Sequence, residues 1–276
     1  MKTFEYLRPT SLKEALDMLK NHDGNVSILN GGTDLIVRMR EGHSSPEVVM
    51  DIKKIPGLDQ IQVDEDRITI GATVLLNDLG LNEVIKTRYP YLAQAALSVG
   101  SKQVRNRATC IGNICNASPL ADTATPLLAL NADVHIYGEE GIKTVPLKDF
   151  FVFVRKTILK PTEIVTGISF KQDPEALGIF TKMSRRKEVD LSTVCSTVMR
   201  SGTEYRISCG AVAPTPVRLS KTEAFLSGKT LTGEVIEEAC KLAEGEVTPI
   251  SDIRASEAYR REMVGVMLRH ALSEWL

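Results

Sequence analysis

The chain of 276 residues has few of the residues on which several common protein classes depend. Its five cysteines form an odd set without a CxxC pair, so the sequence indicates neither a disulfide framework nor a metal-binding knuckle, and we expect reduced thiols. The four histidines, at positions 22, 43, 135 and 270, are too dispersed to predict a catalytic cluster. No GxGxxG follows the first predicted buried strand, which excludes the commonest dinucleotide-binding turn.

The chain also lacks an excess of charge of either sign. Its net charge is -1 and its pI is near 6.5, so it has no basic footprint of the kind that binds nucleic acid. It has no long uncharged apolar run, and Glu5 and Arg8 interrupt the place where a signal peptide needs its apolar core. We therefore expect no membrane insertion and a cytoplasmic location. With 43% hydrophobic residues, the chain can bury a core large enough for two domains.

Hydrophobic periodicity predicts a mixture of helices and strands. Ser11 and Glu14 form a capping-box pattern ahead of a helix over residues 12–19, and short strands are predicted at 26–29 and 47–52. Further β-rich segments are residues 67–70, 132–137, 142–145, 163–170, 192–200 and 204–212. Helical patterns occupy residues 81–86, 91–99, 124–131, 221–226, 233–244 and 255–275. Because strands and helices do not alternate strictly as in a Rossmann fold, the predicted class is α+β.

The last of these helices predicts a packing face for the C-terminal part. Its apolar face is predicted to carry Tyr259, Met263, Val266, Met267 and His270. The change in pattern after Pro174 predicts one domain over residues 1–174, with subdomains of about 1–55 and 56–174, and a smaller second domain over residues 175–276.

Residues 28–35, ILNGGTDL, predict a strand that runs into a Gly-Gly turn. Two glycines have no Cβ and can adopt dihedral angles closed to other residues, so backbone N–H groups there can converge on an anion. The alternative is a tight strand-to-helix turn with Thr33 or Asp34 as N-cap. This short motif by itself leaves both readings open.

Residues 100–122, GSKQVRNRATCIGNICNASPLAD, predict a long irregular segment, because Gly100, Gly112 and Pro119 interrupt any regular element. Its small and amide side chains, with Asp122 as an acceptor for hydroxyl groups, suit a cradle for a sugar-phosphate or ribityl chain. The alternative is an Ω-loop that is held by its own Asn and Ser turns.

GGTDL at 31–35, GSKQVRNRATCIGN at 100–113 and ASPLAD at 117–122 together resemble the FAD-binding medium subunit of the molybdenum hydroxylases, the family of bacterial carbon monoxide and xanthine dehydrogenases. The resemblance covers nearly the whole chain, from FEYLRPTSLKEAL through FTKMSRRKEVDLSTV to RASEAYRREMVGVMLRHAL, and the joint order of these motifs is specific. It implies a two-subdomain FAD-binding domain of the vanillyl-alcohol-oxidase (PCMH) type. A small α+β domain with an antiparallel sheet and helices follows.

The resemblance also implies where FAD binds. Backbone groups of residues 28–35 would wrap the pyrophosphate, a second loop at 108–115 would complete the cradle, and Asp122 would bind ribityl or ribose hydroxyls. Ile164, or its neighbour Val165, would pack on a ring, and Lys182 would stabilise the reduced flavin. The predicted cofactor-binding residues are Ile28, Leu29, Asn30, Gly31, Gly32, Thr33, Asp34, Leu35, Ala108, Thr109, Gly112, Asn113, Cys115, Asp122, Ile164 and Lys182.

Two positions carry open alternatives. The family usually has Gly-Gly-Asn where this chain has Ile111, Gly112 and Asn113, so either Ile111 points away from the cofactor or FAD sits slightly differently. Lys182 precedes a basic run at 185–187, and its alternative is a solvated charge in that run.

The chain has no cysteine set for [2Fe–2S] clusters and no room for a molybdopterin domain. The resemblance therefore implies a small iron–sulfur subunit and a large molybdopterin subunit as partners, in a heterotrimer or its dimer. The implied function is electron transfer from the iron–sulfur clusters through FAD to NAD or another acceptor, with no catalytic or metal-binding residue on this chain. The alternatives are a non-catalytic nucleotide-binding module and a self-contained flavin oxidase of the same fold.

Overall fold

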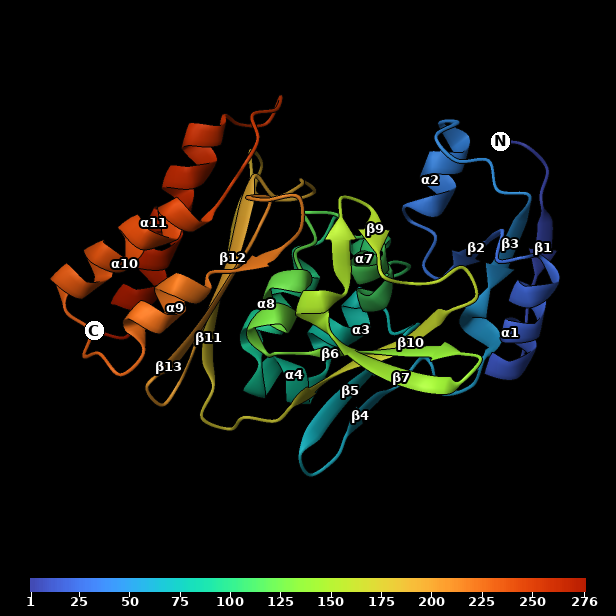
Figure 1. The fold of residues 1–276 in the computed structure, drawn as a ribbon, viewed down its shortest axis with the longest axis horizontal. Coiled ribbons are helices and arrows are strands. Elements are labelled where there is room, and N and C mark those ends of the chain that lie inside the picture. Colours follow the sequence, from blue (N-terminus) through green and yellow to red (C-terminus); the bar gives the residue numbers. More distant parts are fainter.

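The computed structural model describes residues 1–276 as three sheets in a row, with helices around them and one small hairpin (Figure 1). The sheet at the N-terminal end is parallel, in the order β1-β3-β2. Its elements are β1 Glu5–Leu7, α1 Leu12–Asn21, β2 Val26–Leu29, α2 Leu35–Arg40 and β3 Val48–Asp51, followed by the short helix η1 Ile52–Lys54. The helix and the two strands predicted in this region are confirmed to within two residues.

The start of α1 is fixed by the predicted capping residues in a modified arrangement. The Ser11 hydroxyl accepts a hydrogen bond from the Glu14 backbone N–H, as the motif requires. The Glu14 carboxylate accepts from the backbone N–H and hydroxyl of Thr10, one residue earlier than a capping box predicts. Ala15, Leu16 and Leu19 form the buried side of the helix.

The central sheet is antiparallel, in the order β4-β5-β10-β6-β7. Its strands are β4 Ile61–Val63, β5 Arg67–Gly71, β6 Asp133–Gly138, β7 Gly141–Pro146 and β10 Ile164–Lys171. The intervening helices are α3 Leu76–Leu81, α4 Glu83–Arg88, α5 Pro90–Leu97, α6 Lys102–Arg105, α7 Cys110–Cys115 and α8 Ala124–Ala129. After β7 come η2 Leu147–Asp149 and a hairpin of β8 Phe151–Phe153 and β9 Lys156–Thr157. The central sheet and its helices share one core of 39 buried residues with the N-terminal elements, which contribute Ala15 and Leu19 of α1, Met50 of β3 and Ile52 of η1.

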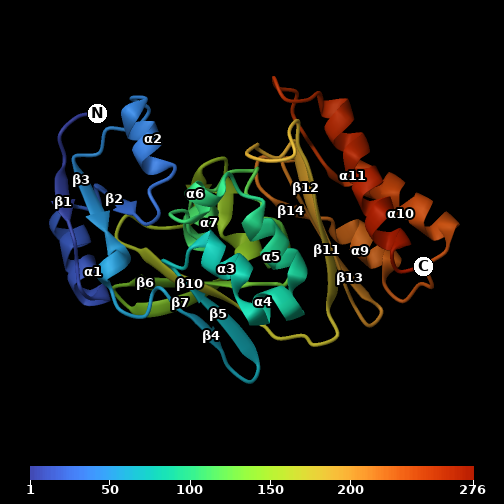
Figure 2. The ribbon, with the colours of Figure 1, turned by 180° about the vertical axis from the view of Figure 1, so that it is seen from behind.

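The C-terminal part forms a second core of 18 buried residues around the antiparallel sheet β11-β12-β13-β14. Its elements are β11 Leu177–Met183, β12 Val194–Ser201, β13 Glu204–Gly210, β14 Val217–Arg218, α9 Ser220–Leu226, α10 Gly233–Glu246 and α11 Glu257–Ser273. Helices α5 and α8 pack against this sheet from the central unit, and α11 packs against β12 (Figure 2). The α+β class and the C-terminal antiparallel sheet with helices are confirmed, whereas the domain boundaries at residues 55 and 174 remain predictions.

The packing face predicted for α11 is wrong at three of its five residues, since only Met267 is buried and Met263 is half-buried against the second core. Tyr259, Val266 and His270 are exposed, and the buried side of the helix is formed by Arg260, Val264, Gly265, Met267, Leu268, Ala271 and Leu272. The physical reason is Arg260, whose side chain is only 2% exposed because its guanidinium donates to the carbonyl oxygens of Thr193 and Ala211 and pairs with Asp252. A hydrophobic pattern treats arginine as a surface residue, so it rotates the predicted face away from the observed one.

Two negative features complete the fold. No helix combines the length and apolarity that crossing a membrane requires. All five cysteines are free thiols, and none takes part in a disulfide.

Candidate functional site

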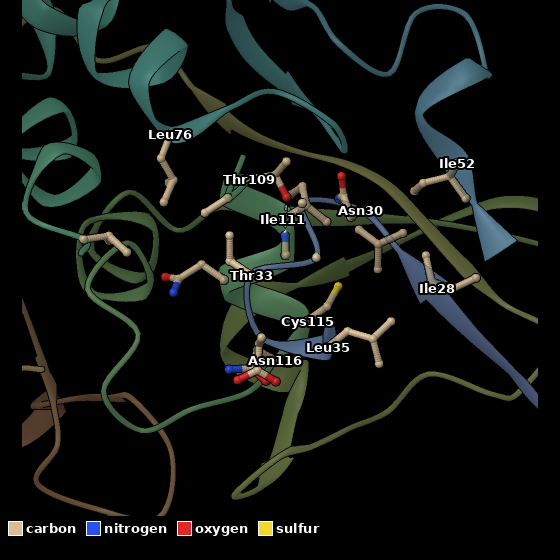
Figure 3. A pocket seen from close by; sticks show the side chains of 18 of the residues that line it. Ile28, Asn30, Thr33, Leu35, Ile52, Leu76, Thr109, Ile111, Cys115 and Asn116 are labelled. Atoms are coloured by element: carbon tan, nitrogen blue, oxygen red, sulfur yellow. Dashed lines mark hydrogen bonds between the residues drawn. The ribbon is translucent and has the colours of Figure 1, made fainter. Parts of the chain in front are cut away.

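A cavity of about 310 Å³ lies between the N-terminal parallel sheet unit and the central unit (Figure 3). Its walls come from the turn between β2 and α2, from α7 with the loop before it, and from the start of β10. The lining residues are Ile28, Asn30, Gly31, Gly32, Thr33, Asp34, Leu35, Ile52, Leu76, Val99, Val104, Ala108, Thr109, Ile111, Gly112, Asn113, Cys115, Asn116, Leu159, Glu163, Ile164 and Val165. The two glycine-containing motifs, far apart in the sequence, therefore face one space.

The Gly-Gly turn after β2 is shaped by contact with the second loop. A Cβ on Gly31 would lie 2.2 Å from the carbonyl oxygen of Arg107 and 2.9 Å from the Cα of Ala108, so the two loops touch backbone to backbone. Gly32 has φ +77°, a left-handed conformation that favours glycine. Both glycines are thus required by the backbone itself.

The same turn leaves its backbone donors unused. None of the N–H groups of residues 31–34 donates a hydrogen bond within the chain. The turn leads from β2 into α2 with Asp34 at the N-cap position, as the alternative reading predicts, but the Asp34 side chain makes no capping bond. A run of unused N–H groups at a cavity wall is suited to an anion such as a phosphate.

The second wall begins with Thr109, which is the N-cap of α7. Its hydroxyl accepts from the Gly112 N–H at 2.9 Å, and the Cys110 N–H donates to the Val74 carbonyl oxygen. The N–H groups of Thr109 and Ile111 donate to no acceptor within the chain. This wall therefore adds backbone donors to the same cavity. The segment 100–122 is not one regular element, as predicted, but it is not irregular throughout either, because it contains the two short helices α6 and α7.

Asn30 contributes a polar group that lacks a partner. Its side-chain Nδ2 donates to the Ala72 carbonyl oxygen at 2.5 Å, but its buried Oδ1 has no hydrogen-bond partner. Its backbone carbonyl accepts from Lys53 Nζ at 3.0 Å, and Lys53 also pairs with the Asp51 carboxylate at 2.7 Å. An unpartnered buried amide oxygen is costly unless a ligand or water satisfies it.

Lys53, which binds the Asn30 carbonyl oxygen, is itself paired with the buried carboxylate of Asp51. Burial raises the pKa of Asp51, but hydrogen bonds from Lys53 and the Tyr6 hydroxyl outweigh burial, and the pKa lies below its ordinary value. Asp51 is therefore ionised at neutral pH and holds Lys53 against the Asn30 carbonyl oxygen.

The rest of the cavity is mostly apolar. Ile28, Leu35, Ile52, Leu76 and Ile164 are among its lining residues, several of them labelled in Figure 3. Such surface suits an aromatic ring system.

Two lining residues bear on the sequence predictions. Ile111 lines the cavity but is only 2% exposed and belongs to the central core, so most of its side chain packs inward. Burial raises the pKa of the Cys115 thiol to about 12, with the neighbouring Cys110 adding to the rise. The thiol of Cys115 is therefore neutral and contributes packing rather than charge.

These features fit FAD, which combines a pyrophosphate, hydroxyl groups and two ring systems. Unused backbone N–H groups from both loops suit the phosphates, and the apolar side chains suit a ring. No lysine or arginine lines the cavity, so the pyrophosphate would be held by backbone dipoles rather than by cationic side chains.

All the predicted cofactor-binding residues line this cavity except Leu29, Asp122 and Lys182. Asp122 and Lys182 form an ion pair at 2.7 Å, with side chains only 6% and 13% exposed. Lys182 Nζ also donates to the Ser98 carbonyl oxygen at 2.9 Å, and the Ser192 hydroxyl donates to Asp122. The reading of Lys182 as a solvated charge in the basic run is wrong, and its predicted contact with FAD remains a prediction.

Several lining residues escaped the prediction. Ile52, Leu76, Leu159 and Glu163 come from scattered segments that carry no glycine or amide signal, and only the fold brings them together. Asn116 is a different case, because it lies inside the amide-rich segment 100–122, and that composition is a signal that could have found it. The lining residues outside the predicted set are Ile52, Leu76, Val99, Val104, Ile111, Asn116, Leu159 and Glu163, together with Val165, which the prediction gave as the alternative to Ile164.

Comparison with known families assigns both parts of the chain. Residues 2–170 match the family described as "FAD binding domain in molybdopterin dehydrogenase". Residues 179–275 match "CO dehydrogenase flavoprotein C-terminal domain". The two matches follow each other along the chain, as the sequence motifs predict.

Individual relatives agree over nearly their full lengths. The carbon monoxide dehydrogenase medium chain of Hydrogenophaga pseudoflava is 32% identical over 275 residues, which cover 98% of this chain and 96% of that one. The xanthine dehydrogenase FAD-binding subunit of Escherichia coli O157:H7 is 30% identical, with 98% of this chain and 94% of the relative covered. A solved structure of the Hydrogenophaga pseudoflava carbon monoxide dehydrogenase superposes with a TM-score of 0.94 at 32% identity, covering 99% of this chain and 96% of its own.

Proposed function

Since the chain belongs to the FAD-binding medium subunits of the molybdenum hydroxylases, we propose that it holds FAD in the cavity between residues 28–35 and 108–116. The observation that carries this proposal is the set of unused backbone N–H groups of residues 31–34, which line a cavity that the second loop also lines and to which no lysine or arginine contributes. In this role the chain is an oxidoreductase component that passes electrons rather than a complete enzyme.

The residues of the cavity divide the work of binding. The N–H groups of residues 31–34 hold the pyrophosphate, and the N–H groups of Thr109 and Ile111 add donors from the opposite wall. Asn30 Oδ1 accepts a hydrogen bond from the cofactor and so gains the partner that it lacks within the chain. The apolar side chains of Ile28 and Ile164 pack on a ring and exclude water from it.

Asp122 and Lys182 act beside the cavity. Lys182 is bonded to the carbonyl oxygen of Ser98, whose neighbour Val99 lines the cavity, so the pair borders the site. A direct contact of Asp122 with a ribityl or ribose hydroxyl, and of Lys182 with the flavin, is part of the proposal. Leu29, the last residue of β2, does not line the cavity; its side chain packs beside Gly32 and supports the turn.

FAD supplies the chemistry of accepting electrons singly and releasing them as a pair. This chain binds the cofactor, and partners supply the other centres: a small iron–sulfur subunit and a large molybdopterin subunit, in a heterotrimer or its dimer. We propose NAD as the acceptor, and the cytoplasm as the location because all five cysteines are free thiols.

The first experiment is reconstitution of the purified chain with FAD, followed by absorption spectroscopy after gel filtration. We expect a yellow protein with one FAD per chain. A folded but colourless protein that takes up no FAD would overturn the proposal and favour a non-catalytic nucleotide-binding module.

Tests of the proposed electron acceptor and of the proposed partner subunits require the native complex. Anaerobic addition of NADH is expected to bleach the flavin of the complex, and an unchanged spectrum would reject NAD as acceptor. Affinity capture of the chain from its host, with peptide identification, is expected to recover two further subunits of the stated kinds. Recovery of the chain alone would reject the heterotrimer.

A further inference from the structure

Arg155 occupies a backbone position that arginine seldom adopts. It lies in the turn of the β8–β9 hairpin, between the paired residues Phe153 and Lys156, with φ +57°. This left-handed conformation is unfavourable for a residue with a Cβ, relative to glycine. Strain of this kind persists where the side chain has another role, and it is often found at ligand clamps.

The Arg155 side chain joins the two loops that form the cavity. Its Nη1 and Nη2 donate to the Asp34 carboxylate at 3.1 and 3.3 Å, and Nη1 donates to Asn116 Oδ1 at 2.7 Å. Its backbone N–H donates to the carbonyl oxygen of Ala117 at 2.9 Å. Asp34 and Asn116 both line the cavity, one on each wall. Three segments that are far apart in the sequence therefore meet at one guanidinium.

The backbone on the second loop is also strained at this point. Ala117, which accepts from Arg155, has φ +47° and is fully buried. The Asp34 carboxylate is available to Arg155 because it does not cap α2, although it stands at the N-cap position. Each loop thus offers hydrogen-bond acceptors to Arg155 of the hairpin: Asp34 from the first loop, and Asn116 and Ala117 from the second.

We propose that Arg155 is a positioning residue that clasps the Asp34 loop to the Asn116 loop and thereby keeps FAD in the cavity. The clasp rests on the proposed function, since it acts on the FAD site described above. Arg155 does not line the cavity, so it acts through the two loops rather than by contact with the cofactor. Opening the clasp lets the walls separate and speeds the release of FAD more than it changes its entry.

The expected effect is moderate because the ion pair is partly solvated. The Arg155 and Asp34 side chains are 43% and 42% exposed, and pairs of this kind contribute little on their own. A bidentate pair with an additional bond to Asn116 contributes more than a single contact. We expect FAD affinity to fall about 3- to 10-fold when the side chain is removed.

The most informative variant is Arg155→Gly, which removes the clasp and also relieves the left-handed strain. We expect the FAD-free protein to melt at an unchanged or higher temperature while FAD dissociates faster. Arg155→Lys keeps the charge but loses the two-pronged geometry, so it is expected to restore only part of the affinity. The matched control is Arg269→Ala, which breaks another bidentate and half-exposed pair, with Glu237 on α10, and should leave FAD binding unchanged.

Hydrogen exchange provides a measurement that does not depend on FAD. In the FAD-free protein, Arg155→Gly should speed exchange at Ile36, whose N–H donates to Gly32, and at Asn116, whose N–H donates to Gly112. Arg269→Ala should leave both amides unchanged.

The outcomes separate the clasp from the FAD site. If wild type binds no FAD, the proposed function fails, while unchanged exchange at Ile36 and Asn116 would independently reject the clasp. If wild type binds FAD and Arg155→Gly binds it equally well, the clasp is rejected and the FAD site stands. A loss of affinity matched by an equal loss of thermal stability would also overturn the clasp, because a general structural role would then explain it.

Discussion

The cavity loops and the Asp122–Lys182 pair are both predicted to contact FAD, but they treat their hydrogen-bonding groups in opposite ways. Along residues 31–34, backbone N–H groups have no acceptor within the chain, and Asn30 Oδ1 is unpartnered. At the pair, Asp122 is bonded to Lys182 and to two serine hydroxyls, and Lys182 has a further carbonyl acceptor. Unused donors mark a region prepared for a ligand, whereas a closed network marks one that stabilises the fold first.

The largest effect is expected from Gly31→Ala. The new Cβ would overlap the Arg107 carbonyl oxygen, which is backbone and cannot move aside like a side chain. The two cavity walls must then separate, and we expect FAD affinity to fall more than about 100-fold, with a loss of roughly 1–3 kcal/mol in unfolding free energy. Titration with FAD and chemical denaturation measure the two effects.

The matched control for this substitution is Gly233→Ala. Gly233 has no atom within 4 Å of its Cβ position and begins α10, so alanine there should leave both quantities unchanged or slightly raise stability. Equal FAD affinity in Gly31→Ala and wild type would place the cofactor elsewhere.

Lys182→Met tests the closed network. Removing the ammonium leaves the buried Asp122 carboxylate without its counter-ion, so unfolding free energy should fall by about 3–5 kcal/mol. The flavin potential should change by less than the roughly 20–45 mV expected of a lysine in contact with the flavin, because Lys182 does not line the cavity and its ammonium is directed at Asp122 and the Ser98 carbonyl oxygen. Denaturation and spectroelectrochemistry give the two values.

A suitable control for the pair is Lys187→Met, which removes an exposed charge from the neighbouring loop. It should change neither quantity measurably. If Lys182→Met shifts the flavin potential by the full amount expected of a lysine in contact and leaves the unfolding free energy unchanged, Lys182 acts on the flavin rather than on the fold. The distinction between the two regions then fails.

Gly32→Ala and Gly42→Ala sharpen the comparison through backbone strain. The two glycines have φ +77° and +78°, so alanine costs a similar backbone strain at each, on the order of 1 kcal/mol. A Cβ on Gly32 would also lie 2.9 Å from Leu29 Cδ1, the end of a flexible side chain that can shift, whereas a Cβ on Gly42 has no atom within 4 Å. Only Gly32 lines the cavity, so only Gly32→Ala should weaken FAD binding, by about 10-fold. Isothermal titration of both variants measures the difference, and equal affinities would show that the turn does not contact the cofactor.

The smallest effect is expected from acid acting on Asp51. Its folded pKa lies below the ordinary value, so its ionic contribution is present above about pH 4 and is lost as pH falls through the folded pKa. Protonation releases Lys53 from Asp51 and loosens the Asn30 carbonyl. Unfolding free energy measured from pH 7 to pH 3 should therefore fall less steeply in Asp51→Asn than in wild type, and parallel curves would contradict this assignment.

Local signals in the sequence were sufficient for much of this fold. The Ser11 cap, the alternating β6–β7 hairpin and the glycines of both loops are each readable within about ten residues. The prediction missed β11, over Leu177–Met183, because half-buried residues fill it without a clear alternation. It misplaced the face of α11 because the burial of Arg260 depends on the carbonyl groups of Thr193, just before β12, and Ala211, just after β13, which no local pattern contains.

The candidate site shows the same difference between residues marked by local sequence motifs and residues brought together only by the tertiary fold. The Gly, Asn and Thr residues of the two loops belong to motifs that can be recognised in the sequence, and the predicted set includes those of them that line the cavity, apart from Asn116. Ile52 and Leu159 are ordinary apolar residues until the fold brings them to the cavity, and the pairing of Asp122 with Lys182 joins positions that are 60 residues apart. An ion pair between residues so far apart in the sequence is set by the tertiary structure and cannot be read from a local pattern.

The cavity takes its walls from residues as early as Ile28 and as late as Val165, and this has a consequence for biosynthesis. When the glycine turn leaves the ribosome, the strand and loop that face it have not been translated. A growing chain therefore carries half a site until β10 has emerged and paired with β5 and β6. Cofactor loading has to follow this pairing, so a translational pause before residue 165 would leave a nascent chain that cannot retain its ligand.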